Sequence, residues 1–351
     1  MNLDLFCQVV DNYGDIGVCW RLAQQLQRQQ QGISIRLFVD DLAAFHRIEP
    51  RINPQSHSQT VKQIHIQHWS QAEISTPAPL VIEAFACELP LAYKQAMPNQ
   101  TRLWINLEYL SAESWVESSH ALPSPQPNGV LKYFFFPGFT PKTGGLLRPT
   151  ATPNPELLDK DFWNSLGLIQ APATDRVAFV FCYEHASLEL LYRCLAAQPH
   201  SWCVLLAASA PEPIAPPATL TVHRLPFIAQ AQFDALLDYA DFNLIRGEDS
   251  FVRAIWAQKP FIWQPYRQDD NYHLQKLQAW LSTTPFSPSR QKLIMDWNCG
   301  QLTSAQLNTE LKDLSDWRQQ CVQYAHTLAQ QTDLATQLLA FCSQISQKTV
   351  K

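Results

Sequence analysis

Charged residues are scarce in this sequence, and no stretch of it is strongly basic. Lys and Arg contribute 26 of the 351 residues and Asp and Glu contribute 31, so 16% of the chain is charged and the formal net charge is −5. Proteins that bind nucleic acids neutralise phosphates with a basic patch or stripe. We therefore expect no nucleic-acid partner. The hydrophobic share of 46% indicates a globular chain and not a disordered one.

Long apolar runs and cysteine motifs are missing as well. No apolar stretch is long enough to cross a bilayer, and the apolar run after Met1 stops at Asp11, unlike a secretory signal. The nine cysteines show no CxxC spacing, and several, such as Cys7 and Cys203, lie within apolar runs. We predict reduced cysteines that pack as small hydrophobic side chains, in a cytoplasmic protein without a membrane partner.

The first half of the chain alternates between short apolar runs and helical patterns. Residues 18–26 follow the first run and place apolar side chains at helical spacing. Strands that alternate with helices predict a parallel sheet covered on both faces. The predicted strands of this half are residues 3–10, 33–40, 64–69, 79–86 and 102–109.

A proline-rich segment at 148–156, RPTATPNPE, precedes a second pattern of the same kind. The chain is long enough for two domains. We place them at residues 1–150 and 151–351. The end of the chain, from about residue 304 to 347, is predicted to be polar and helical, and we expect C-terminal helices to pack back on the N-terminal domain. Residues 121–129 are predicted to be a surface loop. The second half is predicted to contain strands at 176–184, 202–208, 220–226, 242–245 and 260–265, and helices at 231–240 and 250–258.

Two Rossmann-like domains facing across a cleft form the α/β layout of GT-B glycosyltransferases. Dinucleotide dehydrogenases contain similar sheets, so the turn after the first strand, VVDNYGDIGVCW, is informative. It lacks the GxGxxG pattern that lets a backbone approach a pyrophosphate. It carries Asp11 and Asp15 instead, which would repel a phosphate. These carboxylates suit proton transfer or the positioning of a nucleophile. The structural alternative is that Asp11 caps a turn and Asp15 caps the helix.

A second polar group surrounds the sequence RGEDS at 246–250. Gly247 permits a sharp turn after a strand, and Asp249 or Ser250 can cap the helix that follows. A helix N-terminus offers free N–H groups to a diphosphate, to which Arg246 adds a full charge. Glu248 would repel a phosphate and is assigned to a sugar hydroxyl or to the loop itself. A well-capped helix start alone would leave most of these polar groups unexplained. The next strand adds Gln264, Tyr266 and Gln268 at the same edge.

Three further side chains suit a nucleoside. Phe227 can stack on a base, Gln230 can pair with its edge, and Tyr183 lies at the carboxyl end of a strand, where open α/β sheets bind ligands. Each is also compatible with simple packing in a core or a loop.

Signals for metal or covalent chemistry are weaker. The single DxD pattern is Asp159 and Asp161, in a segment where we predict a solvated turn instead of a Mg²⁺ site. The histidines show no ligand spacing, and His65 and His68 alternate with apolar residues as strand residues do. The GxSxG elbow of esterases is absent. We expect neither a metal nor a cofactor.

Two long segments, FCQVVDNYGDIGVCWRLA and RGEDSFVRAIWAQKPFIWQPYRQDDNYHLQKL, resemble the EarP family, the elongation factor P arginine rhamnosyltransferases of bacteria. The resemblance covers essentially the whole chain, including GFTPKTGGLLR at 138–148. It implies a GT-B enzyme that moves rhamnose from TDP-β-L-rhamnose to one arginine of elongation factor P and inverts the anomeric centre. The implied partners are this protein acceptor and the nucleotide sugar, and no metal is needed.

The resemblance also implies roles for single residues. Asp15 is expected to be the general base, with Asp11 orienting it or the guanidinium, although either could take the proton. Glu248 corresponds to an essential glutamate of the family. Two alternatives stay open: a GT-B enzyme with a glycan or lipid acceptor, and a nucleotide-binding regulator without activity. The expected nucleotide-sugar contacts are Asn12, Tyr13, Gly14, Tyr183, Phe227, Gln230, Arg246, Gly247, Asp249, Ser250, Gln264 and Tyr266.

Overall fold

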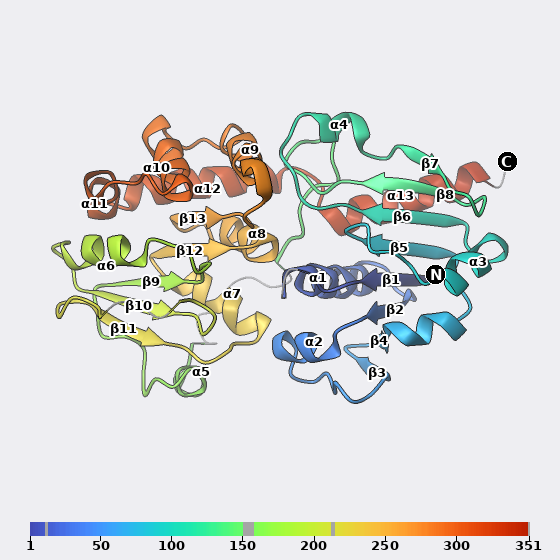
Figure 1. The fold of residues 1–351 in the computed structure, drawn as a ribbon, viewed down its shortest axis with the longest axis horizontal. Helices are drawn as coiled ribbons and strands as arrows, with labels where there is room; N and C mark the ends of the chain where they lie inside the picture. The colour runs from blue at the N-terminus through green and yellow to red at the C-terminus, as the bar shows by residue number, and fades with distance from the viewer. Residues whose placement is uncertain (11–12, 150–157, 212–214, 350–351) are drawn as a thin grey trace. The chain divides into compact units, whose positions relative to one another are not determined.

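The chain forms two compact units in a computed structural model that describes residues 1–10, 13–149, 158–211 and 215–349 (Figure 1). Unit 1 contains residues 1–150 together with 329–351, and unit 2 contains residues 151–328. Asp11, Asn12 and most of the proline-rich segment at 148–156 lie outside the described residues.

Unit 1 is built on an eight-stranded, mostly parallel sheet (Figure 1). Its strands are β1 (Asn2–Cys7), β2 (Ser34–Val39), β3 (Ser58–Val61), β4 (Ile64–His68), β5 (Leu80–Ala84), β6 (Leu103–Leu107), β7 (Pro123–Pro125) and β8 (Leu131–Phe135). Their spatial order is β3-β4-β2-β1-β5-β6-β8-β7. At the two edges, β3 pairs antiparallel with β4 and β7 pairs antiparallel with β8. The six inner strands run parallel in the 3-2-1-4-5-6 order of a Rossmann sheet.

The core of unit 1 packs around β1, which is buried from Leu3 to Cys7. On one face Phe6 stacks on Phe38 with ring centroids 4.5 Å apart, and it meets Tyr93 edge to face. The helices of this unit are α1 (Gly14–Gln29), α2 (Leu42–Ile48), α3 (Leu91–Ala96), α4 (Trp115–Ser119) and α13 (Leu334–Thr349). Helix α1 contacts β1, β2 and α13, so a helix from the end of the chain completes the first unit.

The GFTPKTGGLLR segment receives this returning end of the chain. Gly145 adopts a φ of 73°, and a Cβ atom there would lie 2.4 Å from the carbonyl oxygen of Thr332. Only glycine allows this approach. Arg148 donates a hydrogen bond to the carbonyl of Ala329 at 2.7 Å. Residues 329–351, which the sequence placed in the range of the second domain, therefore belong to unit 1.

Unit 2 contains a five-stranded parallel sheet in the order β11-β10-β9-β12-β13 (Figure 1). The strands are β9 (Arg176–Val180), β10 (Trp202–Leu206), β11 (Thr221–Arg224), β12 (Phe242–Arg246) and β13 (Phe261–Gln264). The helices are α5 (Lys160–Ser165), α6 (Leu188–Ala196), α7 (Gln230–Tyr239), α8 (Glu248–Ala257), α9 (Tyr272–Leu281), α10 (Pro288–Cys299), α11 (Ser304–Lys312) and α12 (Ser315–Ala329).

Every predicted strand overlaps an observed one, but the ends differ: most observed strands are shorter, β1 begins one residue earlier and β12 ends one residue later. β1 ends at Cys7 because residues 8–10 already belong to the turn. The prediction of a plain loop at 121–129 is wrong, since Pro123–Pro125 forms β7 against β8. Proline is tolerated there because β7 is an edge strand. His65 and His68 lie in β4, as predicted.

The cysteines pack as predicted, with one exception. All nine are free, eight are buried and Cys299 is exposed. Burial raises the pKa of Cys182 to about 12, which keeps this thiol protonated and unreactive. Among the described residues, no helix combines the length and the apolar character that a bilayer span needs.

Candidate active site

Both sheets offer a ligand site at the point where strand order reverses. In unit 1, β1 lies between β2 and β5, and in unit 2, β9 lies between β10 and β12. Open α/β sheets bind ligands at the carboxyl ends of strands beside such a reversal. The segment Tyr13–Asp15 follows β1, Tyr183 follows β9, and the RGEDS segment spans the end of β12 and the start of α8. The residues singled out from the sequence therefore lie at the edges where this fold binds ligands.

Asp15 in the first turn of α1 is buried and held from two sides. Its Oδ2 accepts a hydrogen bond from the backbone N–H of Val10 at 2.9 Å, and its Oδ1 accepts one from the Tyr109 hydroxyl at 3.3 Å. The residue is only 3% exposed. The N-cap of α1 is Tyr13, so the alternative in which Asp15 caps the helix is wrong. Gly14 is the first helical residue.

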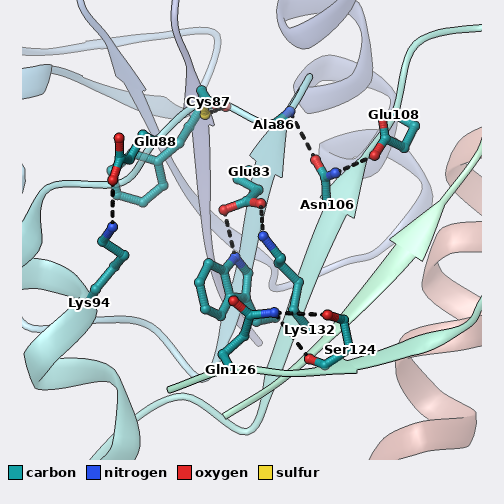
Figure 2. Close-up of polar contacts among 12 residues, drawn as sticks. Glu83, Ala86, Cys87, Glu88, Lys94, Asn106, Glu108, Ser124, Gln126 and Lys132 are labelled. Atoms are coloured by element: carbon teal, nitrogen blue, oxygen red, sulfur yellow. Dashed lines mark hydrogen bonds and ion pairs between the residues drawn. The ribbon is translucent and has the colours of Figure 1, made fainter. Parts of the chain in front are cut away.

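The segment after β5 fixes the position of Tyr109. Phe85 and Ala86 adopt left-handed φ angles of 59° and 55°, which non-glycine residues rarely do. The N–H of Ala86 donates to Asn106 Oδ1 at 3.0 Å, which holds this segment in place (Figure 2). The Phe85 ring stacks on Tyr109 with centroids 4.4 Å apart. The sequence reasoning missed Tyr109, although its place at the carboxyl end of a predicted strand was an available signal.

A pocket of about 600 Å³ lies beside β5, β6 and β8 in unit 1. Glu83 is one of its lining residues: Lys132 Nζ lies 2.7 Å from Oε1 (Figure 2), and Trp104 Nε1 donates to Oε2 at 3.0 Å. Burial raises the pKa of Glu83, and Lys132 opposes this rise. Near the rim Glu88 pairs with Lys94 at 3.1 Å. The charges of this pocket are thus balanced from within.

Gly247 forms the turn between β12 and α8 in unit 2. Its φ of 73° and ψ of −176° lie in a region that is essentially restricted to glycine. Gly247 is itself the N-cap of α8, so the prediction that Asp249 or Ser250 caps this helix is wrong. Both residues lie in its first turn. The Asp249 carboxylate accepts a hydrogen bond from Gln230 Nε2 at 3.1 Å. This bond links two of the residues predicted to contact the nucleotide sugar.

Arg246 stands at the carboxyl end of β12 among aromatic rings. Its guanidinium carbon lies 4.7 Å from the ring centroid of Phe181 and 4.6 Å from that of Tyr183. The N–H of Tyr183 donates to Oε1 of Gln264 at 3.2 Å, and Gln264 is 1% exposed. Tyr266 meets Tyr183 edge to face at 6.0 Å. The structure thus brings Tyr183, Arg246, Gln264 and Tyr266 together.

The remaining predicted residues of unit 2 lie on the same edge of its sheet. Phe227 is half-buried in the segment between β11 and α7, and Glu248 is the first residue of α8. His185, which the sequence reasoning did not select, stacks on Tyr183 with centroids 5.8 Å apart. Burial lowers the pKa of His185, and the neighbouring Arg267 and His273 lower it further. His185 is therefore neutral at pH 7, and Arg246 supplies positive charge at this edge beside the carboxylates of Glu248 and Asp249.

The DxD pattern has a structural role at one of its two carboxylates. Asp159 caps α5, where its Oδ1 accepts a hydrogen bond from the N–H of Phe162 at 2.8 Å. Within the described ranges, no group of three or more His, Cys, Asp or Glu side chains is arranged to hold a metal ion.

Comparison with known proteins agrees with this geometry. The family model described as elongation factor P (EF-P) rhamnosyltransferase EarP matches residues 3–343. A protein-arginine rhamnosyltransferase of Pseudomonas aeruginosa is 39% identical over 96% of this chain and 98% of its own length. The enzyme of the same name from Pseudomonas putida is 45% identical over 80% of each chain.

Solved structures show the same fold. A structure described as the basis for EarP-mediated arginine glycosylation of translation elongation factor EF-P aligns with a TM-score of 0.63 and 27% identity, over 98% of this chain and 99% of that one. The spinosyn rhamnosyltransferase SpnG complexed with thymidine diphosphate aligns with a TM-score of 0.55 at 10% identity, over 97% and 99% of the two chains, and shares the fold alone. The prediction of an α/β GT-B fold is confirmed. The chain is a glycosyltransferase and belongs to the EarP family of EF-P rhamnosyltransferases.

Proposed function

We propose that this chain transfers L-rhamnose from TDP-β-L-rhamnose to an arginine side chain of elongation factor P, with inversion at the anomeric carbon. Relatives that match over most of the chain are named protein-arginine rhamnosyltransferases. The observation that carries the proposal is Asp15, a buried carboxylate held by Val10 and Tyr109 at the strand-order reversal of unit 1.

Arginine needs such a carboxylate because its guanidinium is a poor nucleophile. The group is delocalised and stays protonated up to a pH above about 12. In our proposal a guanidinium nitrogen attacks C1 of rhamnose and forms the C–N bond as the bond from C1 to the diphosphate oxygen breaks. Asp15 takes the proton lost by nitrogen, and the electron pair of the broken bond leaves with TDP. Asp11, outside the described residues, is proposed to orient the guanidinium, and Glu248 to contact the sugar.

Unit 2 supplies groups that suit the leaving diphosphate. Arg246 carries a full charge, and α8 begins two residues later at Glu248 with the partial positive charge of a helix N-terminus. Fixed positive groups stabilise charge that develops in a transition state. We propose that they replace a metal ion, that Phe227 stacks on the thymine, and that Gln230 contacts its edge. In this scheme unit 1 binds the acceptor protein and unit 2 the nucleotide sugar, in the cytoplasm.

Mass spectrometry of elongation factor P tests the proposal. Purified chain, TDP-β-L-rhamnose and elongation factor P should yield an acceptor with one added deoxyhexose on one arginine. The acceptor with lysine at that arginine is the matched control and should stay unmodified. Transfer only to a glycan or lipid would favour the second GT-B reading. Binding of TDP-rhamnose without transfer to any acceptor would favour a regulator.

A further inference from the structure

A second pocket in unit 2, of about 460 Å³, lies at the amino ends of its strands. Arg176 is the first residue of β9, Asp241 directly precedes β12, and Lys259 directly precedes Pro260 and β13. The start of α12 lines the pocket with Ser315 and Arg318. We call it the amino-edge pocket. The candidate active site lies at the opposite, carboxyl edge, roughly 13 Å away along a five-residue strand.

The cations of the amino-edge pocket are not held by close polar contacts with the part of the chain that the structure describes. Arg176, Lys259 and Arg318 make no side-chain hydrogen bond or ion pair with any residue that the structure describes. The one carboxylate in the lining, Asp241, accepts the backbone N–H of Val177 at 2.9 Å. Arg176 and Lys259 are both half-buried, so water solvates them less than it would at an open surface.

A neighbouring arginine shows how this unit treats a buried cation that serves the fold. Arg290 is 7% exposed at its side chain, and it pairs with Glu310 and with Asp316, each at 2.7 Å. Asp316 lies on α12, close in sequence to Arg318. The pocket beside Glu83 in unit 1 is likewise balanced by its own charges. The amino-edge pocket differs from both because its cations form no close ion pair among the described residues, although Asp241 and Asp238 act on Lys259, and Arg176 acts on Asp313.

Two of the three cations, Lys259 and Arg318, also repel one another. Burial lowers the pKa of Lys259, and Arg318 lowers it further. Cations gathered without an anion are unfavourable, and a bound anion would relieve this repulsion. Asp241 and Asp238 only partly oppose the effect.

We propose that the amino-edge pocket binds a small organic phosphate monoester. The three cations outnumber the single lining carboxylate by two, and a phosphate monoester carries about −1.5 to −2 charges at pH 7. The planar forks of Arg176 and Arg318 match phosphate oxygens. Leu314, Val322 and Pro260 give the pocket an apolar wall for the organic part. The volume also falls within the range of about 300–1,000 Å³ that is usual for small-molecule sites.

Calorimetric titration of the full chain with phenyl phosphate tests this site. We expect saturable binding at one site per chain. Phenyl sulfate has a similar shape but one negative charge, and it should bind about ten-fold more weakly or worse. Lys259→Met and Arg318→Gln should each weaken phenyl phosphate binding by about ten-fold or more, the size expected when one charged hydrogen bond is lost. Arg318 is exposed, so its variant tests the site even if Lys259→Met does not fold.

Two controls separate this site from other anion sites. Lys312→Met removes an exposed cation at the end of α11 that does not line the pocket, and it should leave binding unchanged. Arg246→Gln, at the candidate donor site, should also leave it unchanged. Three results would each overturn the proposal. These are no saturable binding of phenyl phosphate, binding by Lys259→Met and Arg318→Gln as tight as by the unchanged protein, and loss of binding in Arg246→Gln. None of these outcomes depends on the proposed transfer of rhamnose.

Discussion

Two turns lie at the carboxyl edges of similarly ordered sheets: the turn after β1 in unit 1 and the turn after β12 in unit 2. The side chains to which we assign their ligand contacts carry opposite charges. The first presents the buried carboxylate of Asp15, and its helix begins after Tyr13 with an ordinary φ of −117°. The second presents Arg246 and begins its helix at Gly247 with a φ of 73°. The strand order therefore determines where a ligand binds at the edge of the sheet, and a few turn residues determine which charged side chain contacts it. The carboxylate of Asp15 suits a cationic arginine, and the guanidinium of Arg246 suits a diphosphate.

The largest expected effect comes from removing the charge of the unit 1 turn. Asp15→Asn keeps an oxygen that accepts the Val10 N–H but cannot take a proton, so transfer should fall by roughly two to four orders of magnitude. Rhamnosylation of elongation factor P under single-turnover conditions measures this loss.

A second carboxylate provides the matched control for Asp15. Asp40 Oδ1 accepts the N–H of Val9 at 2.9 Å and so holds the same turn without a proposed role in proton transfer. Asp40→Asn should keep most activity if it folds. Equal losses in the two variants would mean that Asp15 only shapes the turn.

Removing the positive charge of Arg246 in the unit 2 turn should weaken binding of the nucleotide diphosphate. Arg246→Gln loses charge-assisted hydrogen bonds to a diphosphate, worth about 1.5–3 kcal/mol or roughly 10- to 150-fold in affinity. Titration with TDP measures the change. Arg193→Gln, whose side chain is 62% exposed on α6, is the control and should bind TDP normally. If Arg246→Gln also binds TDP as the unchanged protein does, the diphosphate lies elsewhere.

Backbone geometry offers a smaller test of the same contrast. Gly247→Ala places a side chain in a glycine-only conformation and should lower the free energy of unfolding by about 1–3 kcal/mol. Gly14→Ala, in helical backbone at the start of α1, should cost no such strain. Chemical denaturation of both variants checks the difference. Equal stabilities would show that the two turns make the same backbone demand.

Removing metal ions should have the smallest effect, because we assign the charge on the leaving diphosphate to Arg246 and α8. Transfer measured in excess EDTA should match transfer in untreated buffer. If EDTA abolishes transfer and Mg²⁺ restores it, the unit 2 turn does not suffice and a metal must share its task.

Much of the fold could be predicted because apolar runs and turn residues report local structure directly. Each predicted strand overlaps an observed one, since buried parallel strands need short continuous apolar runs. The sequence could not show that Pro123–Pro125 pairs with β8, because that pairing depends on an edge position set by the whole sheet. Nor does local pattern give the residue at which the chain returns to unit 1, since this depends on distant contacts such as those of Gly145 with Thr332 and of α1 with α13.

The candidate site was predicted where its residues lie close together along the chain. Arg246, Gly247 and Glu248 follow one another, so a single turn places them together. The partners of Asp15 are harder to find because Tyr109 is distant in sequence and is positioned by Phe85, a residue with an unusual left-handed backbone. Cap preferences favour Asp and Ser, so they suggest Asp249 or Ser250 as the cap of α8 and Asp15 as an alternative cap of α1, whereas the observed caps are Gly247 and Tyr13.

The discontinuity of unit 1 also affects the order in which the protein can be completed during synthesis. Domains generally fold as units while the chain emerges, the amino-terminal one first. Here all the residues of unit 2 have been added at residue 328, whereas unit 1 still lacks residues 329–351. Until α13 has been synthesised, the side of α1 that packs against α13 in the finished unit is not covered by that helix. The second unit in the sequence can therefore be the first to finish, and a chain that stops directly after residue 328 would carry all the residues of unit 2 but an unfinished unit 1.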